Sequence, residues 1–470
     1  MCSDLYVESV CTILIGMGYR HKLNLSDSIS IVAGSMIGCG IFIVSADIAR
    51  QVQSGLLMML VWIVAGIVTM CGSLSFAELS ANISEEGGQY IYLKRIYNDT
   101  VAFLYGWTTF LVIQTGIIAA VCTAFSKFIG LLIPFISANN YLFHIGAFHI
   151  STQKIFTVLV VILLTFINSR GLKHGVFTQN LFTVTKVLSM IGIVGLGLFL
   201  GANFHTLKMN LVMPIHFNFD TINILSTATV GALFASITWN NITFVSGDIE
   251  KPEKTIPKAL FIGTSIVLGL YFLINSIYVS AMPLNLIQNA PEDIVAAQLM
   301  SIIFGPVGKT IAAIIIMISA FGSANGIILA GARVYYKMAK DRAFFRGLAA
   351  IDRKSRVPHN SLWIQCLWVC ILVMWGNYTQ LLDYVIYTTL IFYWITTFGI
   401  FLYRRRVGLK NLKFKVWTII PVLYLLVTGY ILVCLTLFKP TYTLPGLLIT
   451  LAGLPVYYFW NNSHKQISDS

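Results

Sequence analysis

The stretch "VAGSMIGCGIF", residues 32–42, lies inside the first long apolar segment of the chain. Gly34, Gly38 and Gly40 fall within it, and each glycine in a helix interior costs about 1 kcal/mol relative to alanine. The cluster therefore predicts that a helix crossing here is interrupted near its middle. A second apolar segment carries a comparable interruption at "ALFASITWNN", residues 232–241, where small and polar residues replace the apolar run.

The composition identifies a polytopic membrane protein. Hydrophobic residues make up 57% of the 470-residue chain and charged residues 10%, whereas soluble domains carry about 25% charged residues. The mean hydropathy is +0.81. A spanning helix needs about 20 mostly apolar residues, and twelve segments meet this need: 26–49, 55–79, 101–135, 154–169, 176–201, 222–247, 257–282, 301–332, 360–376, 379–403, 415–437 and 443–461. The predicted fold class is an all-α membrane protein with 12 transmembrane helices.

The distribution of basic residues predicts the orientation. If the N-terminus is cytoplasmic and the segments alternate, most of the 31 Lys and Arg residues fall in cytoplasmic connections, as the positive-inside rule requires. Both termini are therefore expected in the cytoplasm. The net charge of +13 reflects this topology and contact with anionic lipid, so it does not indicate a nucleic-acid partner.

The two interrupted segments are the first and the sixth, which suggests a repeated architecture. Interrupted segments at matching places in two halves point to the binding site of a transporter built from inverted repeats. We therefore expect a five-plus-five inverted repeat followed by two additional helices. The expected boundaries are a cytoplasmic segment 1–23, a first repeat 24–203, a second repeat 204–403, two extra helices in 404–462 and a cytoplasmic tail 463–470.

A broken helix offers a site for a zwitterion. The N–H groups that start its second half bind an anion such as a carboxylate, and the carbonyls that end its first half accept hydrogen bonds from an ammonium group. The alternative for Gly34 and Gly38 is close helix packing through small residues. Taken alone, these residues favour packing; the matching interruption in the sixth segment favours a site.

Lys186 lies well inside the fifth segment, where an ionisable residue is a functional candidate by default. Polar residues of the eighth segment, in "ISAFGSANG" at 318–326, are possible partners for its ammonium. The alternative is a lysine that extends to the cytoplasmic interface. For Lys127, nearer the outer end of the third segment, such snorkelling is the favoured interpretation.

Other features give weaker signals. The stretch 76–95, with Gly87 and Gly88, is either a gating loop beneath the transport path or a solvated connection, and the charged turn 247–257 reads as an ordinary loop. The connections near 136–153, 203–221 and 283–300 are expected as outer loops. The eight cysteines and eight histidines show no metal-ligand spacing or disulfide framework. We expect no metal, no cofactor and no catalytic residues, because no catalytic cluster or phosphate loop is present.

Several segments together resemble one transporter superfamily. They are "VAGSMIGCGIFIVSADIARQ", "AELSANISEEGGQYIYLKR", "FLYGWTTFLVIQTG", "WNNITFVSGDIEKPEKTIPKAL" and "SANGIILAGARVYYKMAKD". The set resembles the amino acid–polyamine–organocation superfamily, and within it the bacterial members of the L-type amino acid transporter branch. The resemblance implies a LeuT-like fold and α-amino acid substrates.

The resemblance also implies a site, residue by residue. The substrate carboxylate is expected at the backbone of Gly38, Cys39 and Gly40. The substrate-binding positions expected around the amino group are Met36 and Ile37 in the first segment and Phe234, Ala235, Ser236 and Ile237 in the sixth. Lys186 matches a lysine that stands in for a sodium ion, here contacting Gly34 and Ser319. Weaker candidates for the pocket or path are Gln114, Thr115 and Trp239.

This chain departs from the family pattern at both breaks. The usual Gly-Ser-Gly reads Gly38-Cys39-Gly40, and the usual glycine-containing break of the sixth segment reads Ser236-Ile237-Thr238. The first change replaces a hydroxyl by a thiol; the second narrows the permitted backbone angles at Ile237 and Thr238 and leaves the substrate range open.

The sequence therefore predicts a sodium-independent transporter of neutral L-amino acids that works by alternating access, with exchange favoured over proton symport. Cationic amino acid or polyamine antiport, a non-transporting sensor, a membrane enzyme and a channel are the weighed alternatives. The expected partners are an L-amino acid and membrane lipid. In the animal members of the family that this chain resembles, a cysteine between the third and fourth segments forms a disulfide with a single-span heavy chain; because 136–153 contains no cysteine, the resemblance implies no such partner here. The expected location is a cell membrane, with the bacterial inner membrane favoured; the oligomeric state is not predicted.

Overall fold

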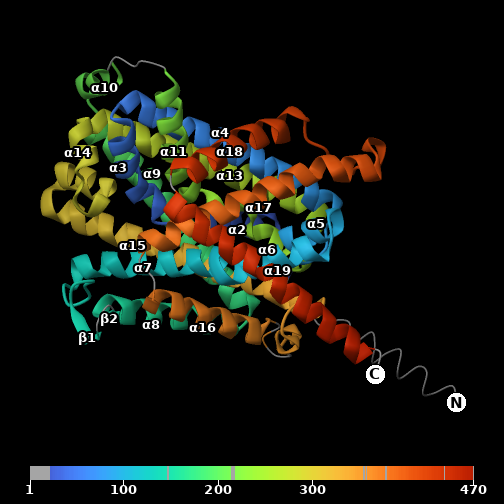
Figure 1. Cartoon of the computed structure of the whole chain (residues 1–470). Coiled ribbons are helices and arrows are strands. Elements are labelled where there is room, and N and C mark those ends of the chain that lie inside the picture. Colours follow the sequence, from blue (N-terminus) through green and yellow to red (C-terminus); the bar gives the residue numbers. More distant parts are fainter. Residues whose placement is uncertain are drawn as a thin grey trace, which may run out of the picture.

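A computed structural model describes residues 22–145, 148–212, 218–352, 355, 357–375, 378–438 and 440–468. The described chain is almost entirely helical (Figure 1). The α-helices are α2 (Leu25–Met36), α3 (Gly40–Val52), α4 (Gly55–Asn82), α5 (Gln89–Ile96), α6 (Asp99–Thr108), α7 (Gln114–Leu132), α8 (Thr152–Ser169), α9 (Leu172–Leu196), α10 (Phe204–Leu211), α11 (Phe219–Ala235), α12 (Asn241–Phe244), α13 (Pro252–Ala281), α14 (Leu284–Gln288), α15 (Val295–Lys340), α16 (His359–Trp375), α17 (Tyr378–Val407), α18 (Ile419–Phe438) and α19 (Pro440–Ser468).

Short irregular helices connect some of these elements. Two π-helical turns, η1 (Thr109–Ile113) and η2 (Gly197–Gly201), lie within long helices, and the 3₁₀ turns are η3 (Ile237–Asn240), η4 (Ser246–Asp248), η5 (Pro291–Asp293), η6 (Arg346–Ala349) and η7 (Leu409–Asn411). An antiparallel hairpin of β1 (Tyr141–Ile145) and β2 (Phe148–Ser151) pairs Phe143 with Ile150.

The long helices have the length and composition of membrane spans. Within the described residues, nine helices qualify singly, and up to eleven if each of two bent pairs is counted as one span. The bent pairs are α2 with α3, at 40°, and α11 with η3 and α12, at 47°. At 17 residues, α16 is shorter. The protein is thus an all-α, multi-pass membrane protein, and large apolar side chains such as Phe177, Leu188 and Phe199 are exposed on its surface.

Three connections contain structure that the sequence did not predict. The connection 136–153 holds the β1–β2 hairpin, 203–221 holds α10, and 283–300 holds α14 and η5. Asn210 of α10 donates hydrogen bonds to the carbonyls of Val279 (2.7 Å) and Met282 (2.8 Å), so α10 is fixed to the end of α13. These short elements carry no long apolar run, which is why hydropathy does not reveal them.

The two bent pairs lie at the centre of the molecule. α2 packs against α9, α13 and α15, whereas α3 packs against α11. α7 packs between α15 and α8, and α8 in turn packs against α16, as the lower part of Figure 1 shows. The helix breaks are therefore enclosed by neighbouring helices, away from lipid, where irregular backbone is tolerated in a membrane.

Candidate functional site

The first helix breaks where its glycines cluster. α2 ends at Met36, Ile37 leaves helical geometry with φ −72° and ψ 90°, and α3 restarts at Gly40 without a side-chain cap from Cys39. A Cβ on Gly40 would lie 3.0 Å from Cα of Ala235, so glycine allows the start of α3 to touch the end of α11. The first N–H groups of a helix have no partner within that helix. In α3 these groups lie beside the second break, at the end of α11.

The second break follows Ala235. Ser236 has φ −115° and ψ 10°, and the chain continues as the tight turn η3 before α12. The Ser236 hydroxyl hydrogen-bonds with the hydroxyl of Thr69 in α4, at 3.0 Å. The Tyr393 hydroxyl of α17 donates to the Ile237 carbonyl at 2.7 Å. Side chains from neighbouring helices thus satisfy the polar groups that the break releases.

One tyrosine bridges the two breaks. The hydroxyl of Tyr271 in α13 lies 2.9 Å from the Met36 carbonyl and 3.0 Å from the Ala235 carbonyl. Met36 and Ala235 are the last residues of α2 and α11, which are the first halves of the two broken helices. A single hydroxyl donor is therefore shared by the carboxyl ends of α2 and α11. The positions of the two breaks are therefore coupled through α13.

Lys186 of α9 points into the same region and is 1% exposed. Its ammonium donates to the carbonyls of Gly34, Ile37 (2.8 Å) and Ser319 (3.4 Å). The Ser319 hydroxyl of α15 also donates to the carbonyls of Ile37 and Gly38, each at 3.1 Å. The Lys186 amine thus lies among backbone oxygens at the carboxyl end of α2, where the helix dipole is negative and favours a cation.

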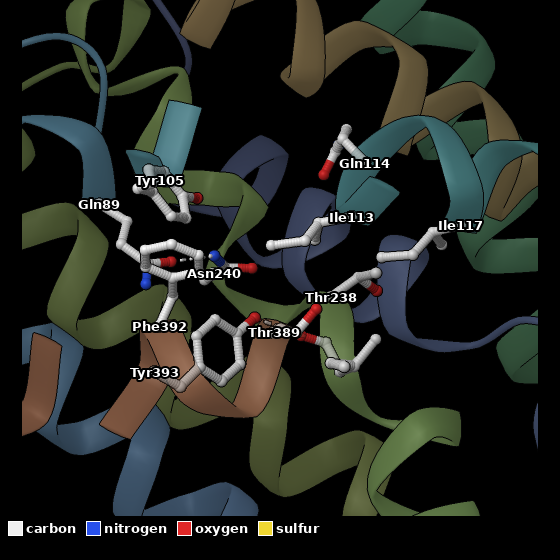
Figure 2. A pocket seen from close by; sticks show the side chains of 11 residues that line it. Gln89, Tyr105, Ile113, Gln114, Ile117, Thr238, Asn240, Thr389, Phe392 and Tyr393 are labelled. Atoms are coloured by element: carbon white, nitrogen blue, oxygen red, sulfur yellow. Dashed lines mark hydrogen bonds between the residues drawn. The ribbon is translucent and has the colours of Figure 1, made fainter. Parts of the chain in front are cut away.

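Two adjoining cavities lie at these breaks. The first, the break cavity, is a narrow space lined by the breaks themselves together with α7 and α15; among its residues are Met36, Gly38, Cys39, Gly40, Phe234, Ala235, Ile237 and Ser323. The second, the polar compartment, is lined by Gln89, Tyr105, Ile113, Gln114, Ile117, Ile237, Thr238, Asn240, Thr389, Phe392 and Tyr393 (Figure 2). Ile117, Ile237 and Thr238 line both cavities. Among the residues that the structure describes, none of those lining the two cavities is charged.

The remaining sequence candidates divide between the cavities and their surroundings. Gln114 lines the polar compartment and donates to the Ile327 carbonyl at 2.9 Å. Thr115 follows the π-helical turn, and its hydroxyl donates to the Phe110 carbonyl at 2.7 Å, within its own helix. Trp239 is buried against the rings of Phe76 and Tyr393. Neither Thr115 nor Trp239 lines either cavity.

Ion pairs tie the elements together on both sides of the breaks. On the side where cytoplasm is expected, Arg333 of α15 pairs with Asp248 at 2.7 Å, and the backbone of Leu23 pairs with that of Ile249. The prediction that the charges of this turn are those of an ordinary loop is therefore wrong for Asp248, because Arg333 is itself buried. On the opposite side Arg50 pairs with Asp293 at 2.7 Å.

Three further ion pairs extend these contacts. Lys127 pairs with Glu292 at 2.9 Å, and its side chain is partly exposed. The ammonium therefore has both an acidic partner and access to solvent. Asp341, which follows α15, accepts from Lys94 at 2.8 Å and Lys337 at 3.0 Å. Partial burial by itself would raise the pKa of this carboxyl, but the hydrogen bonds from the two lysines outweigh burial and lower the pKa.

Sequence reasoning did not identify Tyr271, Tyr393, Gln89 or Asn240 as candidates. A tyrosine in an apolar helix is an ordinary residue, and nothing in the sequence marks Tyr271 as opposite two helix breaks. Gln89 directly follows the Gly87–Gly88 pair. The one sequence signal for Gln89 is therefore the interpretation of 76–95 as a gating loop beneath the transport path.

Comparison with known proteins gives a consistent result. Residues 23–458 match the profile of the family described as amino acid permease. The chain is 27% identical over 463 residues to the large neutral amino acids transporter small subunit 2 of Mus musculus, covering 97% of this chain and 84% of that protein. It is 28% identical over 446 residues to the serine/threonine exchanger SteT of Bacillus subtilis, covering 94% and 97%. It is 26% identical over 455 residues to the human Asc-type amino acid transporter 1, covering 95% and 84%.

Proposed function

Because the chain belongs to the amino acid permease family, we propose that it is a sodium-independent secondary transporter that exchanges neutral L-amino acids by alternating access. The names of its relatives, a large neutral amino acids transporter and a serine/threonine exchanger among them, support the substrate class and the exchange mode. In this proposal the protein is a transporter and not an enzyme, and its ligand is the amino acid alone.

The break cavity supports an amino acid as substrate. The N-terminal turn of α3, at Gly38, Cys39 and Gly40, offers N–H groups for the carboxylate. The ends of α2 and α11 offer the carbonyl oxygens of Met36 and Ala235 for the ammonium group, because each oxygen has two lone pairs and the Tyr271 hydroxyl occupies one of them. The uncharged lining of both cavities supports neutral side chains, because a cationic side chain buried without an acidic partner is unfavourable.

The contacts of Lys186 carry the proposal of sodium independence. A sodium ion bound between α2 and α15 needs several oxygen ligands, and the carbonyls of Gly34, Ile37 and Ser319 already receive the lysine ammonium. In this proposal the ammonium of Lys186 supplies, between α2 and α15, the positive charge that a bound sodium ion would otherwise supply. If Lys186 instead releases its proton during the cycle, the protein is a proton-coupled symporter, which is the second candidate.

The ion pairs on the two sides support alternating access. Asp248–Arg333 and the Leu23–Ile249 bridge lie beneath the breaks, and Arg50–Asp293 lies on the other side. We propose that each set opens while the other stays closed. The proposal includes twelve spans, cytoplasmic termini, the five-plus-five inverted repeat with its boundaries at 203 and 403, location in a cell membrane such as the bacterial inner membrane, and function without a disulfide-linked heavy chain.

The test is uptake of labelled amino acids by the purified full-length chain in proteoliposomes. Vesicles preloaded with unlabelled amino acid are compared with empty vesicles, with sodium or choline outside and with or without an acid-outside pH gradient. Uptake that requires preloading and does not depend on sodium supports the exchanger. Uptake into empty vesicles driven by external acid supports the symporter, and binding without flux for every amino acid would overturn transport.

A further inference from the structure

The turn that precedes α5 packs directly against the second broken helix. Gly87 and Gly88 have φ values of +111° and +51°, a region that side chains rarely adopt. A Cβ on Gly88 would lie 2.4 Å from the Thr243 hydroxyl oxygen and 2.8 Å from a ring carbon of Phe244, both in α12. Glycine thus lets this turn contact α12 at the backbone, and the next residue, Gln89, is fully buried.

The amide of Gln89 has a fixed orientation. The Thr396 hydroxyl donates its proton to the Phe392 carbonyl at 2.7 Å, so this hydroxyl accepts from Gln89 Nε2, at 2.9 Å. Gln89 Oε1 consequently faces Asn240 and accepts from its Nδ2 at 3.3 Å, the hydrogen bond drawn in Figure 2. One amide therefore joins α5, η3 and α17. A glutamine amide has two N–H groups and two lone pairs, so these bonds leave one donor and one acceptor position.

Gln89 closes the end of the polar compartment that is remote from the break cavity. Figure 2 shows Gln89 beside Asn240 at one end and Ile117 at the opposite end, with Thr238 between them. Ile117 and Thr238 also line the break cavity. An amino acid whose carboxylate and ammonium occupy the two breaks therefore has its side chain beside Thr238, directed into a compartment that ends at Gln89.

From this geometry, and resting on the proposed function, we propose that Gln89 is a specificity-determining residue. It limits the length of side chain that the compartment accepts, and its amide favours uncharged side chains with a hydrogen-bonding end over apolar ones of equal size. Asparagine and leucine, and glutamine and methionine, are matched pairs for this discrimination. A site that offers hydrogen bonds rejects an analogue that lacks the partner, because its buried polar groups are then left unpaired.

The experiment measures how unlabelled asparagine, leucine, glutamine and methionine compete with a labelled substrate for exchange by the full-length chain in proteoliposomes. Gln89→Leu removes the amide at similar volume, Gln89→Asn keeps the amide on a shorter side chain, and Thr396→Val is the matched control. Thr396 does not line the compartment, so this control removes a hydrogen bond to Gln89 without changing the compartment wall. Thermal unfolding of each purified variant reports its folding.

We expect wild type to prefer the polar member of each pair, and Gln89→Leu to reduce that preference by roughly three- to tenfold, the effect of one neutral hydrogen bond. Gln89→Asn should keep the preference for the polar member of each pair and shift it toward the longer amino acids, glutamine over methionine. Thr396→Val should change the exchange rate with little change in the preference between polar and apolar members. Equal effects of Gln89→Leu on all four amino acids would overturn the proposal, as would a wild type without preference. If Gln89→Leu does not fold, the length shift in Gln89→Asn decides. Absence of exchange in wild type would overturn the proposed function itself.

Discussion

Lys186→Met is the substitution that most directly tests how the first broken helix is held. Methionine has a similar length and fits an apolar surrounding, but it cannot donate to the three carbonyls that the ammonium contacts. Two of these carbonyls, from Gly34 and Ile37, belong to the end of α2, where no following helical turn supplies N–H donors. We expect α2 to lose its fixed position against α9 and α15, and we expect the rate of amino acid exchange to fall sharply.

The size of the effect follows from these contacts. A buried acceptor left without a partner costs about 1–3 kcal/mol, so the two carbonyls at the end of α2 together cost about 2–6 kcal/mol. The Ser319 hydroxyl still donates to Ile37, which favours the lower end of that range. Since about 1.4 kcal/mol corresponds to a factor of ten, a cost of about 2 kcal/mol should make the conformation with α2 fixed against α9 and α15 roughly 30-fold less populated, and exchange should fall by a similar factor.

The assay is exchange of labelled substrate by preloaded proteoliposomes, with Lys127→Met as the matched control. The Lys127 side chain is 41% exposed and pairs with Glu292 at 2.9 Å. Exposed pairs contribute about 0.2–1 kcal/mol, so the control should stay within about fivefold of wild type. A Lys186→Met protein that also exchanges within fivefold of wild type would refute the reasoning. Exchange restored to this variant by sodium would indicate that the cation can replace the ammonium.

Three further substitutions test other parts of the structure. Tyr271→Phe removes the donor shared by the two helix breaks and should lower exchange by about tenfold, as the loss of one buried hydrogen bond predicts; unchanged exchange would show that the bridge is dispensable. Glu78→Gln breaks a buried pair with Arg404 (N···O 2.6 Å) and should cost about 3–5 kcal/mol of unfolding free energy, and an unchanged unfolding midpoint of the purified protein would contradict this. Asp341→Asn should lower the melting temperature near neutral pH. Because its two lysine partners lower the pKa of Asp341 in the folded protein, that difference should shrink as the pH falls below about 4, where the carboxyl of the unfolded chain takes up its proton first, and vanish once the folded carboxyl is protonated as well; a difference independent of pH would count against the lysine contacts.

The sequence by itself determined that the chain is an all-α membrane protein and where the two helix breaks fall; the number of twelve spans stays a prediction, since nine to eleven spans qualify among the described residues. Long apolar runs specify spanning helices because an unpaired backbone in lipid is too costly for any other structure, except a closed barrel. Gly38 and Gly40 in one segment and Ser236 in the other interrupt those runs, and the structure has its bends at these places. Lys186 was identifiable for a similar reason, since a charge at membrane depth requires partners. These are local properties of short stretches.

Only the tertiary structure decided which residues meet at the breaks. Tyr271 bridges two carbonyls that are 199 residues apart in sequence, and Gln89 reaches Asn240 and Thr396 across separations of 151 and 307 residues. Tyrosine and glutamine carry no marker of such contacts, because their partners are set by how whole helices pack and not by neighbours in sequence. The same holds for Arg333 with Asp248. Helix breaks are encoded locally, whereas the walls of the cavities beside them arise from the packing of distant segments.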